Sequence, residues 1–187
     1  MISTSEMKKG ASVEIDGGLY RIEEVQHVKT KKSAVYHVKL RDLRAGHITE
    51  RSFNAGEKLP VARVERRRMQ YLYGDADNHT MMNSETFEQI MVPTRIIEDA
   101  LPYMKESDEV QVVLFGDEAL GVELPAAVEL VIATSEPGVK GDTATGATKP
   151  ATLETGLVVN VPLFMNPGDT IKVSTSDARY LERTKTA

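Results

Sequence analysis

The sequence predicts an all-β protein built from three small modules. Short apolar runs with strand-like spacing recur along the chain, separated by Gly, Pro, Asn and Asp, and only one stretch has helical spacing. The ratio of Lys+Arg to Asp+Glu also changes, from 12:9 in residues 1–65 to 5:12 in residues 66–128 and 6:7 in residues 129–187. We therefore expect modules at 1–65, 66–127 and 128–187, each near the lower size limit for independent stability.

The composition is that of an ordinary soluble globular protein. The 187 residues are 41% hydrophobic and 27% charged and include no Cys, which excludes disulfides, zinc-thiolate sites and thiol nucleophiles. No apolar run approaches the ~20 residues of a membrane span, and the first ten residues lack the apolar segment of a signal peptide. We expect a cytoplasmic protein with no membrane partner.

The first module is predicted to be a small barrel or curled sheet. Val13 and Ile15 precede Asp16-Gly17-Gly18, a sequence typical of a tight hairpin turn. A second strand is expected through residues 20–28, where Tyr20, Ile22, Val25 and Val28 carry the apolar pattern. Further strands are expected at residues 35–40 and 48–53.

The second and third modules are predicted mainly from apolar runs. Strands are expected at residues 61–65, 69–73, 80–82, 110–115, 119–124, 128–133, 157–161, 171–174 and 180–182. Thr94 is the expected N-cap of a single helix, because Ile96, Ile97, Ala100 and Leu101 follow it at helical spacing. Residues 135–150 form a Gly/Thr/Pro-rich loop that is long for a compact domain.

No catalytic constellation is recognisable, so we expect no enzyme, no cofactor and no metal. Neither a Gly-rich phosphate loop nor a Gly-x-Ser-x-Gly motif is present. His27, His37 and His47 lie ten residues apart, and two of them could bind a metal together with Asp42 across a hairpin. The alternative is that they are surface residues of amphipathic strands.

Three segments are candidates for contact with a polyanion, each with a simpler alternative. Lys29, Lys31 and Lys32 lie on a short connection that is either a solvated hairpin end or a rigid arm carrying cations to phosphates. Arg66, Arg67 and Arg68 form either a solvated run or a phosphate patch. The loop containing Gly141, Asp142, Thr143, Thr145 and Gly146 offers backbone donors and hydroxyls that could grip RNA, or it is only a connection.

Several long segments resemble those of bacterial translation elongation factor P. The longest, residues 149–164, reads Lys-Pro-Ala-Thr-Leu-Glu-Thr-Gly-Leu-Val-Val-Asn-Val-Pro-Leu-Phe and is followed by Pro167-Gly168-Asp169. Residues 137–143, 71–73, 82–89 and 38–43 also match, in the family's order, and together the matches span essentially the whole chain.

The resemblance implies an SH3-like barrel followed by two OB folds, in an L-shaped arrangement that mimics tRNA. It also implies a cytoplasmic, monomeric factor that binds both ribosomal subunits, peptidyl-tRNA, rRNA and mRNA. Such a factor stimulates peptide-bond formation on ribosomes stalled at consecutive prolines. The first-module hairpin tip would reach the acceptor end of peptidyl-tRNA, and the third module would reach the small subunit and the exit-site codon.

The hairpin tip departs from the family pattern. The family reads Pro-Gly-Lys-Gly, with a lysine that a modifying enzyme extends, whereas this chain reads Thr30-Lys31-Lys32-Ser33 without either glycine. Counting from the preceding strand places the tip at Lys32, our preferred position, and counting back from Lys39 places it at Lys31. The altered turn leaves open whether a lysine-modifying enzyme is a partner.

Two other classes of protein share some of these features. An elongation factor P-like paralogue also varies at the tip, although Glu85-Thr86-Phe87-Glu88-Gln89 favours the principal family. A generic OB-type RNA-binding protein would use aromatic side chains on a basic face, and this chain is only 5% aromatic with no Trp.

Overall fold

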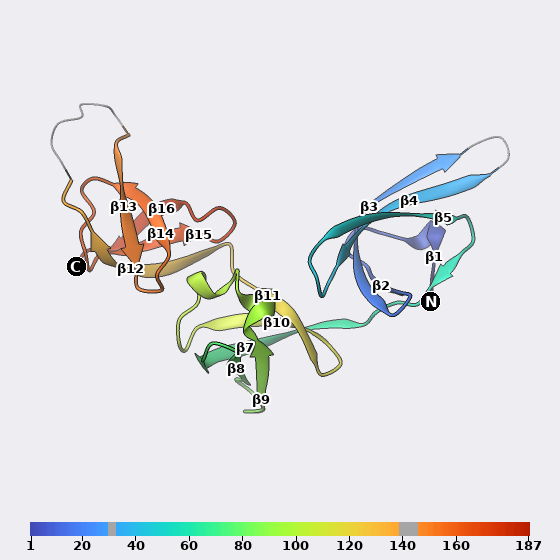
Figure 1. Cartoon of the computed structure of the whole chain (residues 1–187), viewed down its shortest axis with the longest axis horizontal. Coiled ribbons are helices and arrows are strands. Elements are labelled where there is room, and N and C mark those ends of the chain that lie inside the picture. Colours follow the sequence, from blue (N-terminus) through green and yellow to red (C-terminus); the bar gives the residue numbers. More distant parts are fainter. Residues whose placement is uncertain (30–32, 139–145) are drawn as a thin grey trace. The chain divides into compact units, whose positions relative to one another are not determined.

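The computed structural model describes residues 1–29, 33–138 and 146–187, and nearly all of the regular structure in these residues is β (Figure 1). The chain divides into two compact units, Met1–Arg67 with Val112–Gly121, and Arg68–Gln111 with Val122–Ala187. The predicted module boundaries at 65 and 127 follow a different division and stay a prediction. No helix in the described part of the chain is long and apolar enough to cross a membrane.

The first sheet has four antiparallel strands in the order β2-β3-β4-β5. They are β2 (Ser12–Ile15), β3 (Gly18–Lys29), β4 (Ala34–Asp42) and β5 (Ile48–Asn54). The predicted tight turn joins β2 to β3, with Asp16 and Gly17 at φ values of 52° and 77°, as a type I′ turn requires. A short helix η1 (Thr4–Glu6) and the pair β1 (Ile2–Ser3) and β6 (Lys58–Leu59) complete this region.

The core of the first sheet consists of alternate side chains from its four strands and from Met7: Val13, Ile15, Ile22, Val38, Leu40 and Phe53. A second cluster in the same unit joins Leu19 and Ala62 to Leu120 of the hairpin that residues 112–121 contribute. Arg44 and Glu118 add a bidentate ion pair, with Nε–Oε1 and Nη2–Oε2 distances of 2.8 and 3.0 Å.

The second sheet has the order β11-β10-β7-β8-β9. Its strands are β7 (Val64–Gly74), β8 (Asn78–Asn83), β9 (Gln89–Pro93), β10 (Glu109–Phe115) and β11 (Glu118–Glu123). Gly74 is required here because a Cβ at this position would lie 1.9 Å from Nδ1 of the buried His79. The imidazole also hydrogen bonds the Tyr71 hydroxyl, at 3.1 Å from Nδ1.

The predicted helix is present but shorter than expected. Helix α1 (Thr94–Ile97) has Thr94 as its first residue and Pro93 at the N-cap position without a capping hydrogen bond, so the prediction that Thr94 is the N-cap is wrong. Residues 101–103 form a separate 3-10 helix, η2 (Leu101–Tyr103). Pro102 explains the break, because it lacks an N–H and disfavours α geometry in the preceding residue.

The third sheet has the order β14-β13-β12-β15-β16. Its strands are β12 (Ala127–Ser135), β13 (Thr148–Leu153), β14 (Val158–Pro162), β15 (Thr170–Ser174) and β16 (Tyr180–Lys185). Its core includes Leu130, Ile132, Leu153, Val161, Met165 and Ile171. β12 runs to Ser135 and β13 begins at Thr148, so both ends of the predicted loop over residues 135–150 belong to strands, and residues 139–145 of that loop lie outside the described residues.

Candidate nucleic-acid interface

The hairpin of β3 and β4 continues as an arm, residues 25–29 and 34–38, at the end of the first sheet (Figure 1), and β5 still pairs with β4 here from Val38 to Val35. Consecutive pairs run from Val25 opposite Val38 to Lys29 opposite Ala34. Beyond Arg21, β3 has no pairing with β2, so this part of β3 is an edge of the sheet. The regular register leaves residues 30–33 as the connection between the strands.

A β-bulge at Glu23 decides which side chains share a face of the arm. The register shifts between Ile22, opposite Leu40, and Glu24, opposite Lys39. The extra residue keeps Val25, His27 and Lys29 on the face that contains the core residue Ile22. Without the bulge, strict alternation would turn these three side chains to the other face.

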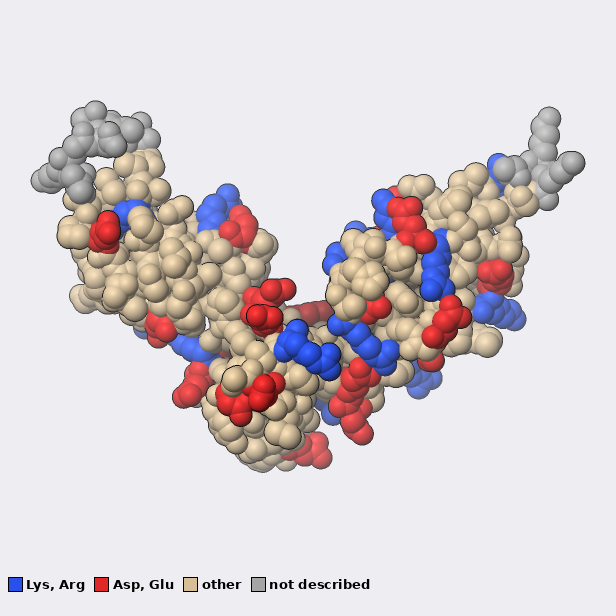
Figure 2. All heavy atoms as spheres, viewed as in Figure 1, with Lys and Arg blue, Asp and Glu red and all other residues tan. Residues whose placement is uncertain are grey.

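Several cations at the base of the arm are paired with carboxylates. Glu23 accepts from Arg41 at 3.0 Å and from Arg21 at 3.1 Å, and these guanidinium groups, Arg41 above all, lower the pKa of Glu23. Lys39 lies 2.8 Å from Glu24, which lowers the pKa of that carboxyl. Figure 2 shows the result, with Lys and Arg side chains interspersed among Asp and Glu over this unit.

Lys29 differs from these basal cations. It is exposed at the last paired position of β3, and no ion pair joins it to another residue of the described chain. The other two predicted tip cations, Lys31 and Lys32, lie outside the described residues. The arm therefore combines a charge-balanced base with an exposed cation near its end.

The predicted arginine patch lies within one continuous strand. Residues 66–68 do not separate two strands, as the sequence suggested, but belong to β7. Strand alternation places Arg67 on the opposite face from Arg66 and Arg68. Arg67 is 3.0 Å from Glu65 and Arg68 is paired with Glu109, so these two cations have carboxylate partners. Arg68 and Glu109 also line an open surface hollow of about 370 Å³.

Of the predicted RNA-binding loop, only Gly146 lies within the described part of the chain. It has a φ of +101° just before β13, and the space where a Cβ would project is open. Gly141, Asp142, Thr143 and Thr145 are outside the described residues. The base of the loop is tied by Lys149, a buried lysine whose Nζ donates to the Glu136 carbonyl at 2.7 Å.

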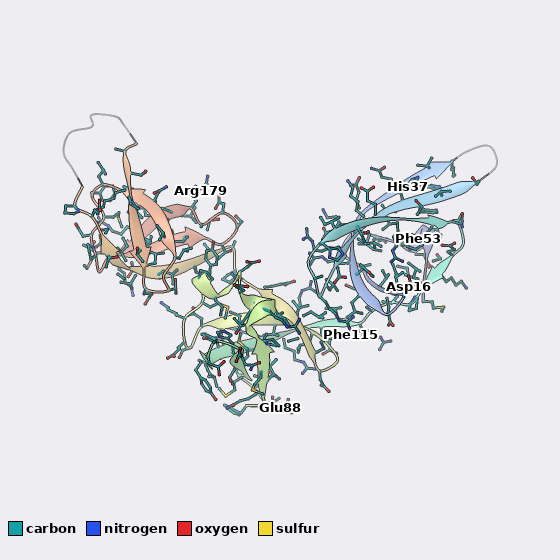
Figure 3. The ribbon with its side chains drawn as sticks, in the orientation of Figure 1. Asp16, His37, Phe53, Glu88, Phe115 and Arg179 are labelled. Atoms are coloured by element: carbon teal, nitrogen blue, oxygen red, sulfur yellow. The ribbon has the colours of Figure 1, made fainter. Side chains whose placement is uncertain are left out.

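The structure does not bring the candidate metal-binding histidines together. His27 and His37 lie on opposite faces of the arm, because His27 pairs with Tyr36, the neighbour of His37. His37 is 2.8 Å from the Ser52 hydroxyl through Nδ1, and it is labelled on the arm in Figure 3. Asp42 accepts from the amides of Arg44 and Ala45 in a turn. Within residues 1–29, 33–138 and 146–187, no group of three or more His, Cys, Asp or Glu could hold a metal ion.

Sequence reasoning missed an aromatic pair on the arm. The rings of His27 and Tyr36 are stacked with centroids 4.4 Å apart and an interplanar angle of 3°. The available signal was positional, since the two residues lie at equal distances from the centre of the hairpin connection. Their face could not be read from the sequence because it depends on the bulge at Glu23.

Together these features define a class of protein: a chain of small β-barrel modules whose candidate contact surfaces are a cationic arm and a Gly-containing loop. Family models match three consecutive regions: the elongation factor P KOW-like domain at residues 3–59, its OB domain at 64–122 and its C-terminal domain at 128–183. The chain belongs to the elongation factor P family and is a translation factor. The predicted all-β fold class of an SH3-like barrel followed by OB folds is confirmed.

Two solved structures to which this chain is similar are initiation factors of the 5A family. Eukaryotic translation initiation factor 5A from Methanococcus jannaschii is 23% identical, with a TM-score of 0.53 over 65% of this chain and 89% of that one. A translation initiation factor 5A family protein from Naegleria fowleri is 18% identical, with a TM-score of 0.48 over 66% of this chain and 96% of that one. At these identities the first likeness concerns the fold alone.

Proposed function

We propose that this chain is a non-enzymatic elongation factor that binds the ribosome beside peptidyl-tRNA. There it stimulates peptide-bond formation at stalls such as consecutive prolines. Membership of the elongation factor P family supports a role in translation on the ribosome. The observation that carries the finer proposal is the arm, whose paired strands continue to Lys29 opposite Ala34 and are joined by residues 30–33.

The proposed mechanism is placement of the reactants. Peptidyl transfer that is slow because a reactant is poorly oriented is accelerated when its motion is restricted, and no acid or base from the protein is needed. Lys31 and Lys32, at the connection of the arm, would contact phosphates at the acceptor end of peptidyl-tRNA. The arm is anchored in the core of the first sheet, and β5 pairs with its β4 strand as far as Val35, so it is a stiff support for such a contact.

The remaining contacts are assigned to the other modules. The third-module loop, with Gly141, Asp142, Thr143, Thr145 and Gly146, would contact rRNA or mRNA at the exit site of the small subunit. The factor would act as a cytoplasmic monomer bound to both ribosomal subunits. Replacement of residues 141–146 by a Ser-Gly turn would then weaken stimulation while leaving the fold intact, and full activity of this variant would exclude the role.

Reconstituted translation of a message with consecutive prolines tests the role of the arm. Wild type is expected to relieve the stall, and Lys32→Ala is expected to bind ribosomes in co-sedimentation yet fail to relieve it. Lys31→Ala tests the register, because loss of activity there with Lys32→Ala active would move the tip by one residue. Lys172→Ala, which removes a half-buried lysine of β15 in another sheet, is the control. If the Lys31→Ala/Lys32→Ala double variant relieves the stall like wild type, the arm does not act through a tip lysine.

Whether a lysine-modifying enzyme acts on the arm is tested separately. An intact-mass measurement of the chain purified from its native host would reveal an extension on a tip lysine. A mass equal to that of the unmodified sequence, from a preparation that relieves the stall, would show that the unmodified lysine is sufficient.

A further inference from the structure

We propose that the stacked pair of His27 and Tyr36 is a binding site for an unpaired nucleotide. The base would stack on the open face of the His27 ring, and the adjoining phosphate would contact Lys29. This inference rests on the proposed function, because it supplies the arm with a contact to single-stranded RNA in addition to the tip cations.

The first support is the burial of the side chains along one row of the sheet. Phe53 of β5, Tyr36 of β4 and His27 of β3 are directly opposite one another in register. Phe53 is 8% exposed and belongs to the core, Tyr36 packs against that core, and His27 is exposed. The His27 ring is thus held by a tyrosine that is itself anchored, which keeps the conformational cost of presenting the ring low. Phe53 is labelled in Figure 3.

The second support is the geometry of the stack. At 4.4 Å and 3°, Tyr36 covers one face of the imidazole. Because β3 is the edge strand at this point, no further strand of the described residues pairs on the opposite side of His27. A flat ring with one supported face and one open face is the arrangement on which proteins stack unpaired bases.

The third support is the charge next to the ring. Strand alternation places Lys29 on the same face as His27, two residues further along β3, opposite the small side chain of Ala34. Each nucleotide of single-stranded RNA carries a base and a phosphate. The His27 ring can stack on the base, and the Lys29 ammonium group can contact the adjoining phosphate. A stacking ring next to a cation therefore suits single-stranded RNA, in which every nucleotide has both a base and a phosphate, better than it suits a protein segment.

The simpler alternative is that the pair only stabilises the arm. Cross-strand aromatic pairs contribute roughly 0.2–1 kcal/mol to sheet stability, and such a role needs no ligand. The two readings differ in one observable, since only a nucleotide site places a base over the His27 ring. His37 provides an internal control, because it is an exposed histidine on the opposite face of the same arm.

Nuclear magnetic resonance of the full chain decides between them. The ring signals of His27, assigned by their loss in His27→Gln, are followed during titration with the single-stranded RNA cytidylyl-cytidylyl-adenosine. We expect upfield shifts of the His27 ring protons with half-saturation at roughly 10–100 mM, because a single stacked base provides only weak affinity. The His37 signals should stay in place. Ribose 5-phosphate, which lacks a base, should leave His27 unshifted.

Either of two results would overturn the site: unshifted His27 signals at saturating trinucleotide, or equal shifts with ribose 5-phosphate, which would mean contact through charge alone. The translation assay then tests its use on the ribosome. His27→Ala should reduce stall relief severalfold, and His27→Phe, which keeps a stacking ring, should retain it. Unreduced relief by His27→Ala would overturn the inference and leave the proposed function standing, whereas failure of wild type to relieve the stall would overturn the proposed function itself.

Discussion

Asp169 shows how a single buried charge organises the end of the third sheet. The residue is 1% exposed, and its carboxylate accepts from the amide of Asn166 at 2.9 Å and from that of Ala187 at 2.8 Å. Arg183 approaches to 3.7 Å. The two backbone amides, that of Asn166 foremost, lower the pKa of Asp169. The carboxylate therefore ties the turn before β15 to the last residue of the chain.

Asp169→Asn is expected to destabilise the protein because an amide cannot replace a carboxylate that accepts from several donors. The loss at pH 7 should be about 1–3 kcal/mol, measured by urea unfolding. Since the folded-state pKa of Asp169 is below its unfolded value of about 3.9, the contribution is complete above that pH. It disappears as the pH falls through the folded-state pKa, so the difference from wild type should shrink in that range.

A matched control is available in the same sheet. Glu182 is an exposed carboxylate of β16, 3.3 Å from Lys172. Glu182→Gln should change the free energy of unfolding by less than about 1 kcal/mol, as is usual for exposed ion pairs. An equal loss of stability in both variants would mean that Asp169 stabilises the protein only through its contribution to the net charge, and not through its hydrogen bonds to the backbone.

At the scale of elements, strand β7 shows that a run of like charges need not form one surface. Arg66, Arg67 and Arg68 are consecutive in an extended strand, so they alternate between its two faces. Arg67 forms an ion pair with Glu65, and Arg68 forms one with Glu109. A phosphate that binds to either of these two arginines would therefore share the guanidinium with a carboxylate or compete with it.

The role of this run is tested by the salt dependence of ribosome binding. If the arginines meet phosphates, replacing all three by Ala should make the dependence of log affinity on log salt less steep, by roughly 0.7–0.9 per lost phosphate contact. Co-sedimentation over a range of salt concentrations measures this slope. An unchanged slope would show that the arginines serve only their carboxylate neighbours.

At the scale of the molecule, residues 68–111 and 122–187 form one compact unit that contains parts of two sheets. Tyr103 of helix η2 packs against the core of the third sheet. The Thr155 hydroxyl donates to the Pro102 carbonyl at 2.6 Å, and Lys105 Nζ is 3.4 Å from Glu154. A 3-10 turn that follows the short helix α1 thus joins the second sheet to the third.

Tyr103→Ala should weaken this connection. We expect a loss of about 1–3 kcal/mol and a broader unfolding transition with a smaller urea m-value, because the parts of the unit would no longer unfold together. Tyr73→Ala is the control, since Tyr73 lies in the same unit and is 59% exposed. A Tyr103→Ala variant that unfolds with the wild-type m-value would show that the remaining contacts are sufficient for cooperativity.

The sequence by itself determined the β class, most strand positions and the tight turn at Asp16-Gly17, because strand period and turn chemistry are local properties. The sequence also carried the family resemblance, in several matching segments that together span essentially the whole chain. It did not reveal β9 or β13, where apolar alternation is weak and the pairing partner defines the strand. The end of α1 at Ile97 was likewise missed, although Pro102 was visible.

Only the tertiary structure decided which residues share a face of the arm. The spacing of Ile22, Val25 and Val28 does not follow strict alternation, and the cross-strand register resolves it by a bulge at Glu23. That shift leaves Val28 exposed and brings His27 over Tyr36. A bulge depends on the partner strand, which lies far along the chain, so local patterns cannot specify it. The site proposed on the arm therefore follows from register, while the charge near its end was legible in the sequence.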